Sequence, residues 1–136
     1  MKIRSHCHSL LLITSALLLA ACGGANAPQG DAAHGKELYA QCAGCHELSK
    51  NMAGPKHCGL MGRAAGSVSD YAYSEAMLDS GIVWNEKTLD EFLIAPIAYV
   101  NGTRMGFAGL TNPTDRADLI AYLREATSDP AICSPD

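Results

Sequence analysis

The sequence predicts a small all-α domain in which helices are joined by long ordered loops. Two observations favour this class. No segment alternates apolar and polar residues clearly enough for a strand, whereas four stretches carry helix signals such as capping residues and apolar positions at helical spacing. The segments between these stretches are rich in glycine and proline, which indicates irregular loops.

The N-terminal residues are expected to be a secretory signal and not part of this fold. Lys2 and Arg4 precede an apolar run over residues 10–21, which is too short to span a bilayer as a stable helix and ends in small residues. A buried core helix is the alternative, but the run has no amphipathic face. The sequence therefore predicts an exported protein.

Two cleavage sites compete at the end of this signal. Leu19-Ala20-Ala21-Cys22 matches a bacterial lipoprotein box, in which Cys22 is lipidated and becomes the first mature residue. Cleavage after Ala27, at an A-x-A site, would instead release a soluble periplasmic protein. Because the lipoprotein box is the more demanding pattern, we expect residues 1–21 to be the signal. Residues 22–30 would then tether the domain flexibly to the periplasmic side of a bacterial membrane.

The first helix of the domain is predicted to run from Asp31 to Cys45. Asp31 can serve as the N-cap, and Leu38, Cys42 and Cys45 share one face. Residues 51–66 are expected to form an irregular loop.

Three further helices are predicted downstream. They are a short one over residues 71–79, one over residues 85–95 that stops before Pro96, and a last one over residues 113–127. Residues 97–112, which contain three glycines, are expected to form a loop. The apolar positions expected to be buried are Leu89, Phe92, Leu93, Leu119, Ile120, Tyr122 and Leu123.

Cys42-Ala43-Gly44-Cys45-His46 is a CxxCH run, the pattern that attaches c-type haem. The two thiols lie about one helical turn apart, which matches the haem vinyl groups, and His46 can ligate the iron. A zinc half-site would need a second ligand pair at finger-like spacing, and a redox pair would adjoin a βαβ pattern. Neither is present. We therefore predict one covalently bound haem c, around which the long loops would fold.

The length and the net charge of the mature protein limit its number of domains and its possible partners. Residues 31–129 are expected to form one domain, followed by a C-terminal tail of residues 130–136, and the domain is expected to be monomeric. Without Lys2 and Arg4, the chain has 8 Lys+Arg against 14 Asp+Glu, a net charge of −6. This balance argues against a nucleic-acid partner.

Cysteine parity suggests a disulfide. Of the six cysteines, Cys7 lies in the signal, Cys22 is lipidated or removed, and two belong to the haem motif. Cys58 and Cys133 remain, and an even remainder in an exported protein suggests that they pair. Two separate free thiols are the alternative.

If His46 ligates a haem iron, a second side chain is expected at the sixth coordination position of that iron. Met105 lies between Gly102 and Gly106, and glycines on both sides allow a loop to approach a porphyrin closely. Met52 and Met77 are interpreted as core residues. The full set of candidates is Met52, Met61, Met77, Met105, His34 and His57.

With these residues in view, the chain resembles class I cytochrome c, and closely the mitochondrial cytochrome c and bacterial cytochrome c2 group, over roughly residues 30–129. The matching runs occur in the family's order. They are Gly30-Asp31, Gly35, Tyr39, the CxxCH motif, Gly54-Pro55, Gly59-Leu60-Met61-Gly62-Arg63, Tyr73-Ser74, Gly81-Ile82-Val83-Trp84, Thr88-Leu89, Gly102-Thr103-Arg104-Met105, Phe107-Ala108-Gly109 and Ala117–Leu123.

The resemblance implies roles for individual residues. His46 and Met105 would be the axial ligands, and the carbonyl of Pro55 would accept a hydrogen bond from the second ring nitrogen of His46. Gly35 and Tyr39 would pack against the last helix. Three side chains are implied beside a haem propionate, two as hydrogen-bond donors and one as a compensating charge: Tyr73, Trp84 and Arg63. Plain core aromatics are the alternative for the first two.

Two departures from the family pattern stand out. Where members usually carry a leucine after Gly-Pro-x, this chain has His57, a polar ring that needs a partner unless it is exposed, followed by Cys58. Where mitochondrial members carry a lysine pair, it has Ile97-Ala98. Docking through a ring of lysines is therefore not expected.

These observations predict a one-electron carrier in an exported electron-transfer chain, and not an enzyme, because filled axial positions leave no open site. Its partners would be redox proteins, with a reductase or dehydrogenase as donor and an oxidase or reductase as acceptor. A lipid on Cys22 would add contact with the membrane. Two alternatives stay open: a module dedicated to one dehydrogenase, and a haem peroxidase or gas sensor with a displaceable sixth ligand.

Overall fold

The structure is a computed structural model, and it describes residues 30–134. The predicted secretory signal, Cys22, the predicted tether up to residue 29 and residues 135–136 lie outside the described residues. The elements in chain order are α1 (Ala32–Leu38), a 3-10 turn η1 (Tyr39–Gln41), α2 (Glu75–Leu78), α3 (Glu86–Ile94), α4 (Pro96–Tyr99) and α5 (Pro113–Ala126).

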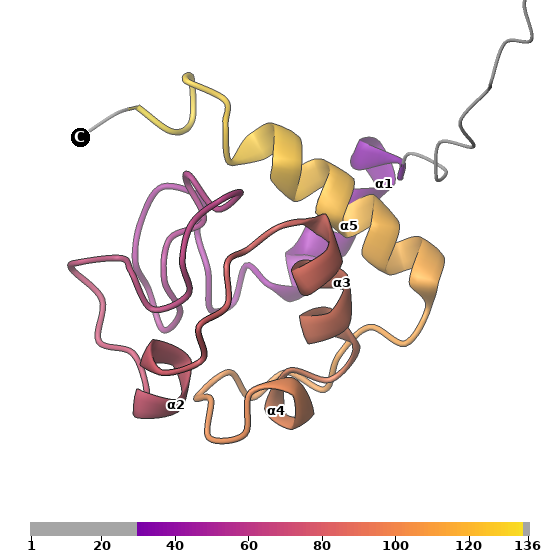
Figure 1. The fold of residues 1–136 in the computed structure, drawn as a ribbon. Coiled ribbons are helices and arrows are strands. Elements are labelled where there is room, and N and C mark those ends of the chain that lie inside the picture. Colours follow the sequence, from indigo (N-terminus) through magenta and orange to yellow (C-terminus); the bar gives the residue numbers. More distant parts are fainter. Residues whose placement is uncertain (1–29, 135–136) are drawn as a thin grey trace, which may run out of the picture.

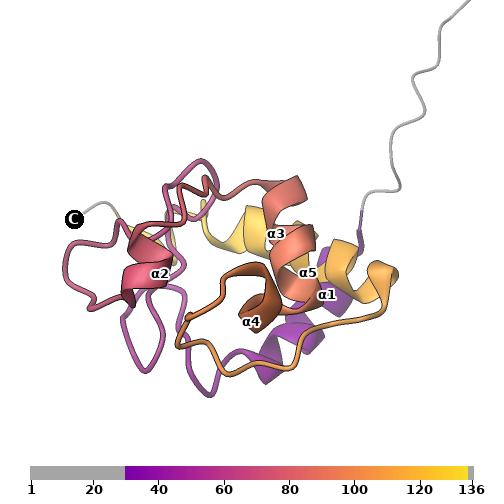
Figure 2. The ribbon, with the colours of Figure 1, turned by 60° about the horizontal axis from the view of Figure 1, so that its bottom comes forward.

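The arrangement is a helix pair with long loops on one side of it (Figure 1). α1 crosses α5, and α3 lies against α5. α2 stands on the far side of the domain, with α4 and the loop after it in between (Figure 2). Between residues 30 and 134 no strand forms, and the only sheet-like pairing is an isolated bridge of Ala64 with Val83. The all-α prediction is therefore confirmed.

α1 and α5 approach so closely that glycine is needed at the crossing. Gly35 is buried, and a Cβ at this position would lie 2.0 Å from the carbonyl oxygen of Asp118. One turn later the ring of Tyr39 packs against that of Tyr122, with centroids 5.3 Å apart. These contacts agree with the packing that the family resemblance implied.

The core lies between α3, α5 and the loops. All but one of the apolar positions expected in α3 and α5 are buried, and Tyr122 is half-buried. Met77 belongs to the core as expected, but the same expectation for Met52 is wrong, because its side chain is 45% exposed in a turn of the irregular loop.

Several predicted boundaries needed correction. The first helix does not continue to Cys45, because backbone bonds tighten after Leu38 into 3-10 and turn geometry: the N–H of Cys42 bonds to the carbonyl of Tyr39 at 2.8 Å. The short helix predicted over residues 71–79 is only α2, because Ser74 caps it: its hydroxyl accepts from the N–H of Met77.

The region after α3 also differs. α3 is capped by a reciprocal Asn85–Thr88 capping box and ends before Pro96, as predicted. The segment predicted as a loop over residues 97–112, however, begins with α4, because Pro96 sits at the first position of a helix, where its missing N–H costs nothing. No helix of the described part is long and apolar enough to cross a membrane.

A polar contact also joins α1 to α5. Nδ1 of His34, a half-exposed side chain, lies 2.8 Å from Oδ2 of Asp118, whose Oδ1 accepts the backbone N–H of Asp31 at 2.6 Å. The hydrogen bond with Asp118 raises the pKa of His34 above its ordinary 6.5. The same bond, with that from Asp31, lowers the pKa of Asp118 below 3.8.

We expect the substitution His34→Gln to destabilise the fold in a pH-dependent way. Glutamine keeps a hydrogen-bond donor but cannot become charged. The His34 contribution is full below about pH 6.5 and is lost as the pH rises through its raised folded-state pKa, while the Asp118 contribution is lost only in acid, as the pH falls through its lowered pKa. Urea unfolding of both proteins at about pH 5.5 and about pH 9 measures the difference. An equal difference in unfolding free energy at both pH values contradicts the assignment.

Candidate functional site

A cavity of about 420 Å³ opens between the loops and the core, within the size range of cofactor sites. Its wall is mainly apolar and includes core side chains such as Leu60, Leu89 and Leu119. The two motif cysteines, His46 and Met105 also line it. The CxxCH motif and Met105, which lie far apart in the sequence, thus line one cavity.

The two cysteines lie in the tight turn that follows η1. Cys42 is half-buried and Cys45 exposed, and both thiols are free within the described chain. Burial raises the pKa of Cys42 to about 11, opposite to the lowered pKa of a catalytic or redox-active thiol. Between residues 30 and 134, no group of three or more His, Cys, Asp or Glu side chains could hold a metal ion, so the zinc alternative has no second ligand pair.

His46 is held in one orientation. Its Nδ1 lies 2.8 Å from the carbonyl oxygen of Pro55, so Nδ1 carries the proton and Nε2 keeps its lone pair for a ligand. A Cβ on Gly54 would come within 2.3–2.6 Å of three ring atoms, which places the Gly54 backbone over the imidazole face. Burial lowers the pKa of His46, with the Pro55 hydrogen bond opposing, and so favours the neutral ring that a metal binds.

The loop that carries Met105 is fastened at several points. The guanidinium of Arg104 donates to the carbonyl of Ala72 at 2.6 Å, and the N–H of Met105 donates to the Thr103 hydroxyl at 3.2 Å. Gly109 has a φ of +103°, and a Cβ there would lie 2.0 Å from the carbonyl oxygen of Ile94. These contacts hold the half-buried Met105 at the cavity wall.

Tyr73, Trp84 and Arg63 all line the same cavity. The Trp84 side chain is 8% exposed, and its indole N–H, which is not fully buried, has no hydrogen bond within residues 30–134. Arg63 donates to the carbonyls of Cys58 and Lys56 at 2.6 and 2.9 Å. The guanidinium is therefore anchored by the backbone, with its positive charge at the cavity wall.

His57 has a role that sequence reasoning left open. Its Nδ1 lies 3.1 Å from the hydroxyl of Tyr39, so the partner it needed is a side chain of the first helical segment. Its ring also stacks on that of His46, with centroids 4.4 Å apart and planes 21° apart. Burial, together with the neighbouring His46 and Arg63, lowers the pKa of His57 to about 3, which keeps the ring neutral.

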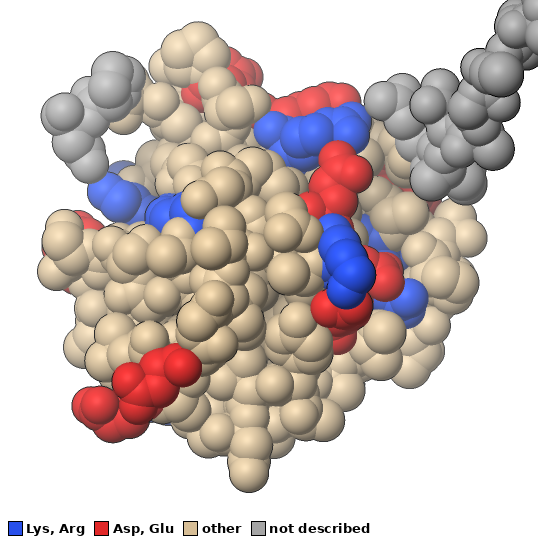
Figure 3. All heavy atoms as spheres, in the orientation of Figure 1, with Lys and Arg blue, Asp and Glu red and all other residues tan. Residues whose placement is uncertain are grey.

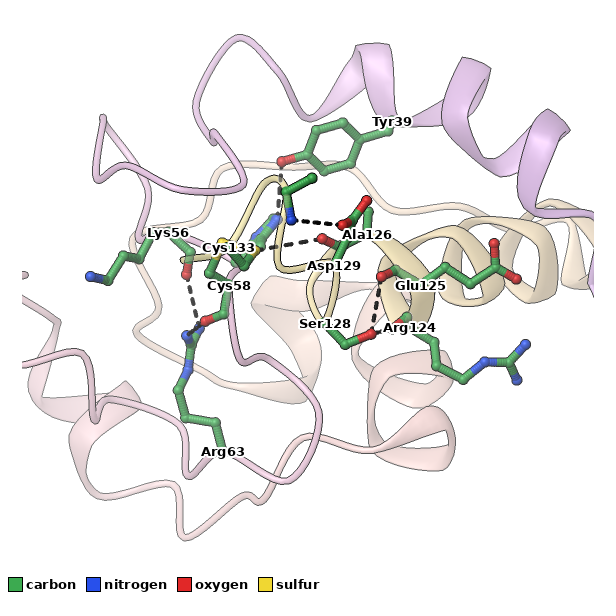
Figure 4. The surroundings of a disulfide bond; sticks show 12 residues. Tyr39, Lys56, Cys58, Arg63, Arg124, Glu125, Ala126, Ser128, Asp129 and Cys133 are labelled. Atoms are coloured by element: carbon green, nitrogen blue, oxygen red, sulfur yellow. Dashed lines mark hydrogen bonds between the residues drawn. A yellow bond between two sulfur atoms is a disulfide. The ribbon is translucent and has the colours of Figure 1, made fainter. Parts of the chain in front are cut away.

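Cys58 and Cys133 form a disulfide, with Cα atoms 5.3 Å apart (Figure 4). The bond joins the loop after the CxxCH motif to the segment after α5, as cysteine parity suggested. A backbone bond of 2.9 Å from Gly59 to Thr127 runs beside it. The disulfide thus links the loop that orients His46 to the chain just beyond the C-terminal end of α5.

The residues present fit a covalently bound haem. One apolar cavity holds two thiols at the CxxCH spacing, an imidazole with one nitrogen left for a metal, and a thioether sulfur. The indole N–H of Trp84, which has no partner within residues 30–134, is free to donate a hydrogen bond to an acidic group of a haem. The family resemblance had implied this set, and the structure brings all of it to one place.

Comparisons with known proteins agree with this geometry. The sequence model described as Cytochrome c matches residues 32–127. Cytochrome c of Theileria annulata is 50% identical over 105 residues, covering 74% of this chain and 90% of that protein. Cytochrome c of Chlamydomonas reinhardtii is 44% identical over 108 residues, covering 76% and 96%. Among solved structures, cytochrome cH from Methylobacterium extorquens superposes with a TM-score of 0.69 at 40% identity, covering 71% of this chain and 99% of that one.

Removing the disulfide should weaken the fold and leave the cavity intact. The double variant Cys58→Ser/Cys133→Ser loses a cross-link between residues 75 apart, which we expect to cost up to about 4 kcal/mol of unfolding free energy in the chain-entropy model. Guanidinium unfolding of the haem-bearing protein measures the loss. As a control, thiol titration of the unreduced, unfolded parent should find neither cysteine free; two free thiols would reject the bridge.

Proposed function

The chain belongs to the cytochrome c family, and on that premise we propose that it carries single electrons outside the cytoplasm on a haem ligated by His46 and Met105. Membership of the family makes the protein an electron carrier with one covalent haem c and redox proteins as partners; it is not an enzyme. The peroxidase and gas-sensor alternatives are therefore not retained.

The observation that supports this ligation most strongly is the shared cavity of His46 and Met105. The Pro55 carbonyl binds Nδ1 of His46, so Nε2 is the nitrogen left to ligate. When bound, the haem supplies one-electron redox chemistry at its iron. A thioether ligand from Met105 favours the softer ferrous state and, with an apolar cavity wall, raises the reduction potential.

The remaining cavity residues would position and shield the group. Cys42 and Cys45 would hold it covalently, and the apolar wall would exclude water from the ligand atoms. Trp84 and Tyr73 would donate hydrogen bonds to a propionate, whose charge the backbone-anchored Arg63 would offset. No side chain in this arrangement needs to gain or lose a proton for an electron to pass.

Replacing Met105 with alanine should open the sixth position without releasing the haem. Attachment depends on Cys42 and Cys45, whereas Met105 contributes only coordination. We expect loss of the red-edge absorbance band typical of methionine bound to ferric iron, a lower reduction potential, and new binding of carbon monoxide or azide.

Met52→Ala is the matched control for this experiment, because Met52 is an exposed methionine of the same domain. It should keep the band and the potential of the parent. A Met105→Ala protein whose spectrum equals the parent's would contradict the assignment and leave another methionine, Met61, as the candidate ligand.

We propose that redox partners dock on a mainly apolar surface beside the loop that carries Met105. Ile97 is 53% exposed there, Ala98, Arg104 and Gly106 are exposed as well, and Phe107 is half-buried. Electron transfer needs a short path and only brief contact, which small interfaces of this kind provide. The donor would be a reductase or dehydrogenase, and the acceptor an oxidase or reductase. A module dedicated to one dehydrogenase is the alternative role for this chain.

The distribution of charge supports such a weakly charged contact. Acidic and basic side chains alternate along the α3–α5 side, and a broad area of the same view is free of charge (Figure 3). Ion pairs join charges of opposite sign on these elements: Arg116–Asp90 and Arg124–Glu86 between α5 and α3, and Lys87–Glu91 within α3. Paired charges of opposite sign give little long-range attraction.

The electron-transfer rate should therefore depend only modestly on ionic strength. The mature chain has a net charge of −6 and no lysine pair at Ile97-Ala98, so it lacks the basic face that steers a carrier towards an acidic oxidase. Stopped-flow kinetics with a membrane oxidase over a salt series measures this dependence. A steep fall in the second-order rate with added salt would show that a charged patch governs docking.

We further propose export through the N-terminal signal and anchoring to a bacterial membrane through a lipid on Cys22. A tether would raise the effective concentration of the carrier near membrane partners without any new contact. The basis is the lipoprotein box; the soluble form cleaved after Ala27 is the alternative.

Mass spectrometry of the mature N-terminus should find diacylglyceryl-modified Cys22 as the first residue. The variant Cys22→Ser should then lose the lipid and leave the membrane fraction. A mature protein that begins after Ala27, without lipid, would contradict the anchor and support a soluble carrier.

A further inference from the structure

The imidazole of His46 has three neighbours that restrain its plane. The Pro55 carbonyl binds Nδ1 at 2.8 Å, and the Gly54 backbone covers part of the ring face. The third neighbour is His57, whose ring lies 21° from parallel at a centroid distance of 4.4 Å. Pro55 and Gly54 belong to the pattern of the family, whereas His57 stands where a leucine is usual.

The ring of His57 is itself held firmly. Its backbone N–H bonds to the carbonyl of Leu48 at 2.9 Å, and the following residue, Cys58, is fixed by the disulfide. The side chain is held by the Tyr39 hydroxyl, 3.1 Å from Nδ1. The backbone and the side chain of His57 are therefore both held in place.

Tyr39 connects this contact to the helix pair. Its ring is buried, with 8% exposure, and it packs against Tyr122 of α5. A rigid sequence of contacts thus runs from the α1–α5 interface through Tyr39 and His57 to the face of His46. A leucine at position 57 could fill the space, but it would offer no flat face and no acceptor for the Tyr39 hydroxyl.

We propose that His57 is a positioning residue for the axial ligand. Held by Tyr39, it fixes the rotation of the His46 ring about the bond from Nε2 to the iron. The proposal rests on the proposed ligation by His46. It assigns His57 a contribution to the electronic structure of the site and not only to the stability of the fold.

The orientation of an axial imidazole can be measured directly. In low-spin ferric haem, the plane of the axial ring helps to set the energies of the iron d orbitals that point towards its π system. The principal g values and the spread of the haem methyl NMR shifts report this orientation. A change that affects only global stability leaves both unaltered in the folded protein.

The test compares the haem-bearing parent with His57→Leu, Tyr39→Phe and the double variant. His57→Leu should shift the largest g value and the methyl pattern while the methionine–iron band stays. Tyr39→Phe, which only frees the His57 ring, should give a smaller shift in the same direction. If Tyr39 acts through His57, the double variant should match His57→Leu alone.

Tyr122→Phe is the matched control. It removes a hydroxyl from the same aromatic cluster, and no hydrogen bond of that hydroxyl is found in the described part of the chain. Its spectra should equal the parent's. If His57→Leu does not fold, Tyr39→Phe against Tyr122→Phe still decides the question.

Two results would overturn the inference. One is parent-like g values and methyl shifts in the folded His57→Leu or Tyr39→Phe protein. The other is a Tyr39→Phe shift that is as large in the His57→Leu background as in the parent, since Tyr39 would then act by another route. A parent without a methionine–iron band would contradict the proposed function itself, which separates the two failures.

Discussion

The structure depends first on the close approach of α1 and α5 at Gly35, where no larger side chain fits against the Asp118 carbonyl. The two ends of this helix pair hold the loop that orients His46. From the end of α1 the chain turns directly into the CxxCH motif, and beyond the end of α5 the Cys58–Cys133 disulfide reaches the segment after His57. The helix crossing is therefore joined through the chain and the disulfide to the loop beside His46, the proposed axial ligand.

Most of the cavity is walled by segments without regular structure, so their order must come from other contacts. Polar side chains supply them by binding backbone groups of neighbouring loops: Asn51 accepts from Lys56, Tyr71 donates to Ala53, and Arg104 donates to Ala72. These bonds give the irregular segments backbone partners where no ladder of a helix or sheet supplies them. The site is thus held in shape by the protein's own polar contacts, and a bound haem would add an apolar body to a core of modest size.

Charged and apolar side chains occupy different parts of the surface. Ion pairs between α3 and α5 place charged side chains on the helical side of the domain, where they join two elements already in contact. The surface beside Met105 carries Ile97 and Ala98 instead of lysines. In the docking mode that we propose, the carrier relies on shape, apolar contact and, with the proposed lipid, on shared location, more than on long-range attraction.

The sequence alone indicated the fold class, the haem motif and four of the helical segments, because spacing, caps and glycine positions are local signals. The resemblance to the family supplied most of the residues expected to line the site. The sequence also indicated the disulfide, through cysteine parity. Tertiary structure decided what local signals could not. The exposure of Met52 depends on how distant segments pack. The end of α1 at Leu38 and the helix begun by Pro96 rest on backbone bonds between near neighbours that the sequence pattern did not reveal. The partner of His57 was equally beyond sequence reasoning, since Tyr39 reaches it only after the helix pair and the loop have packed together.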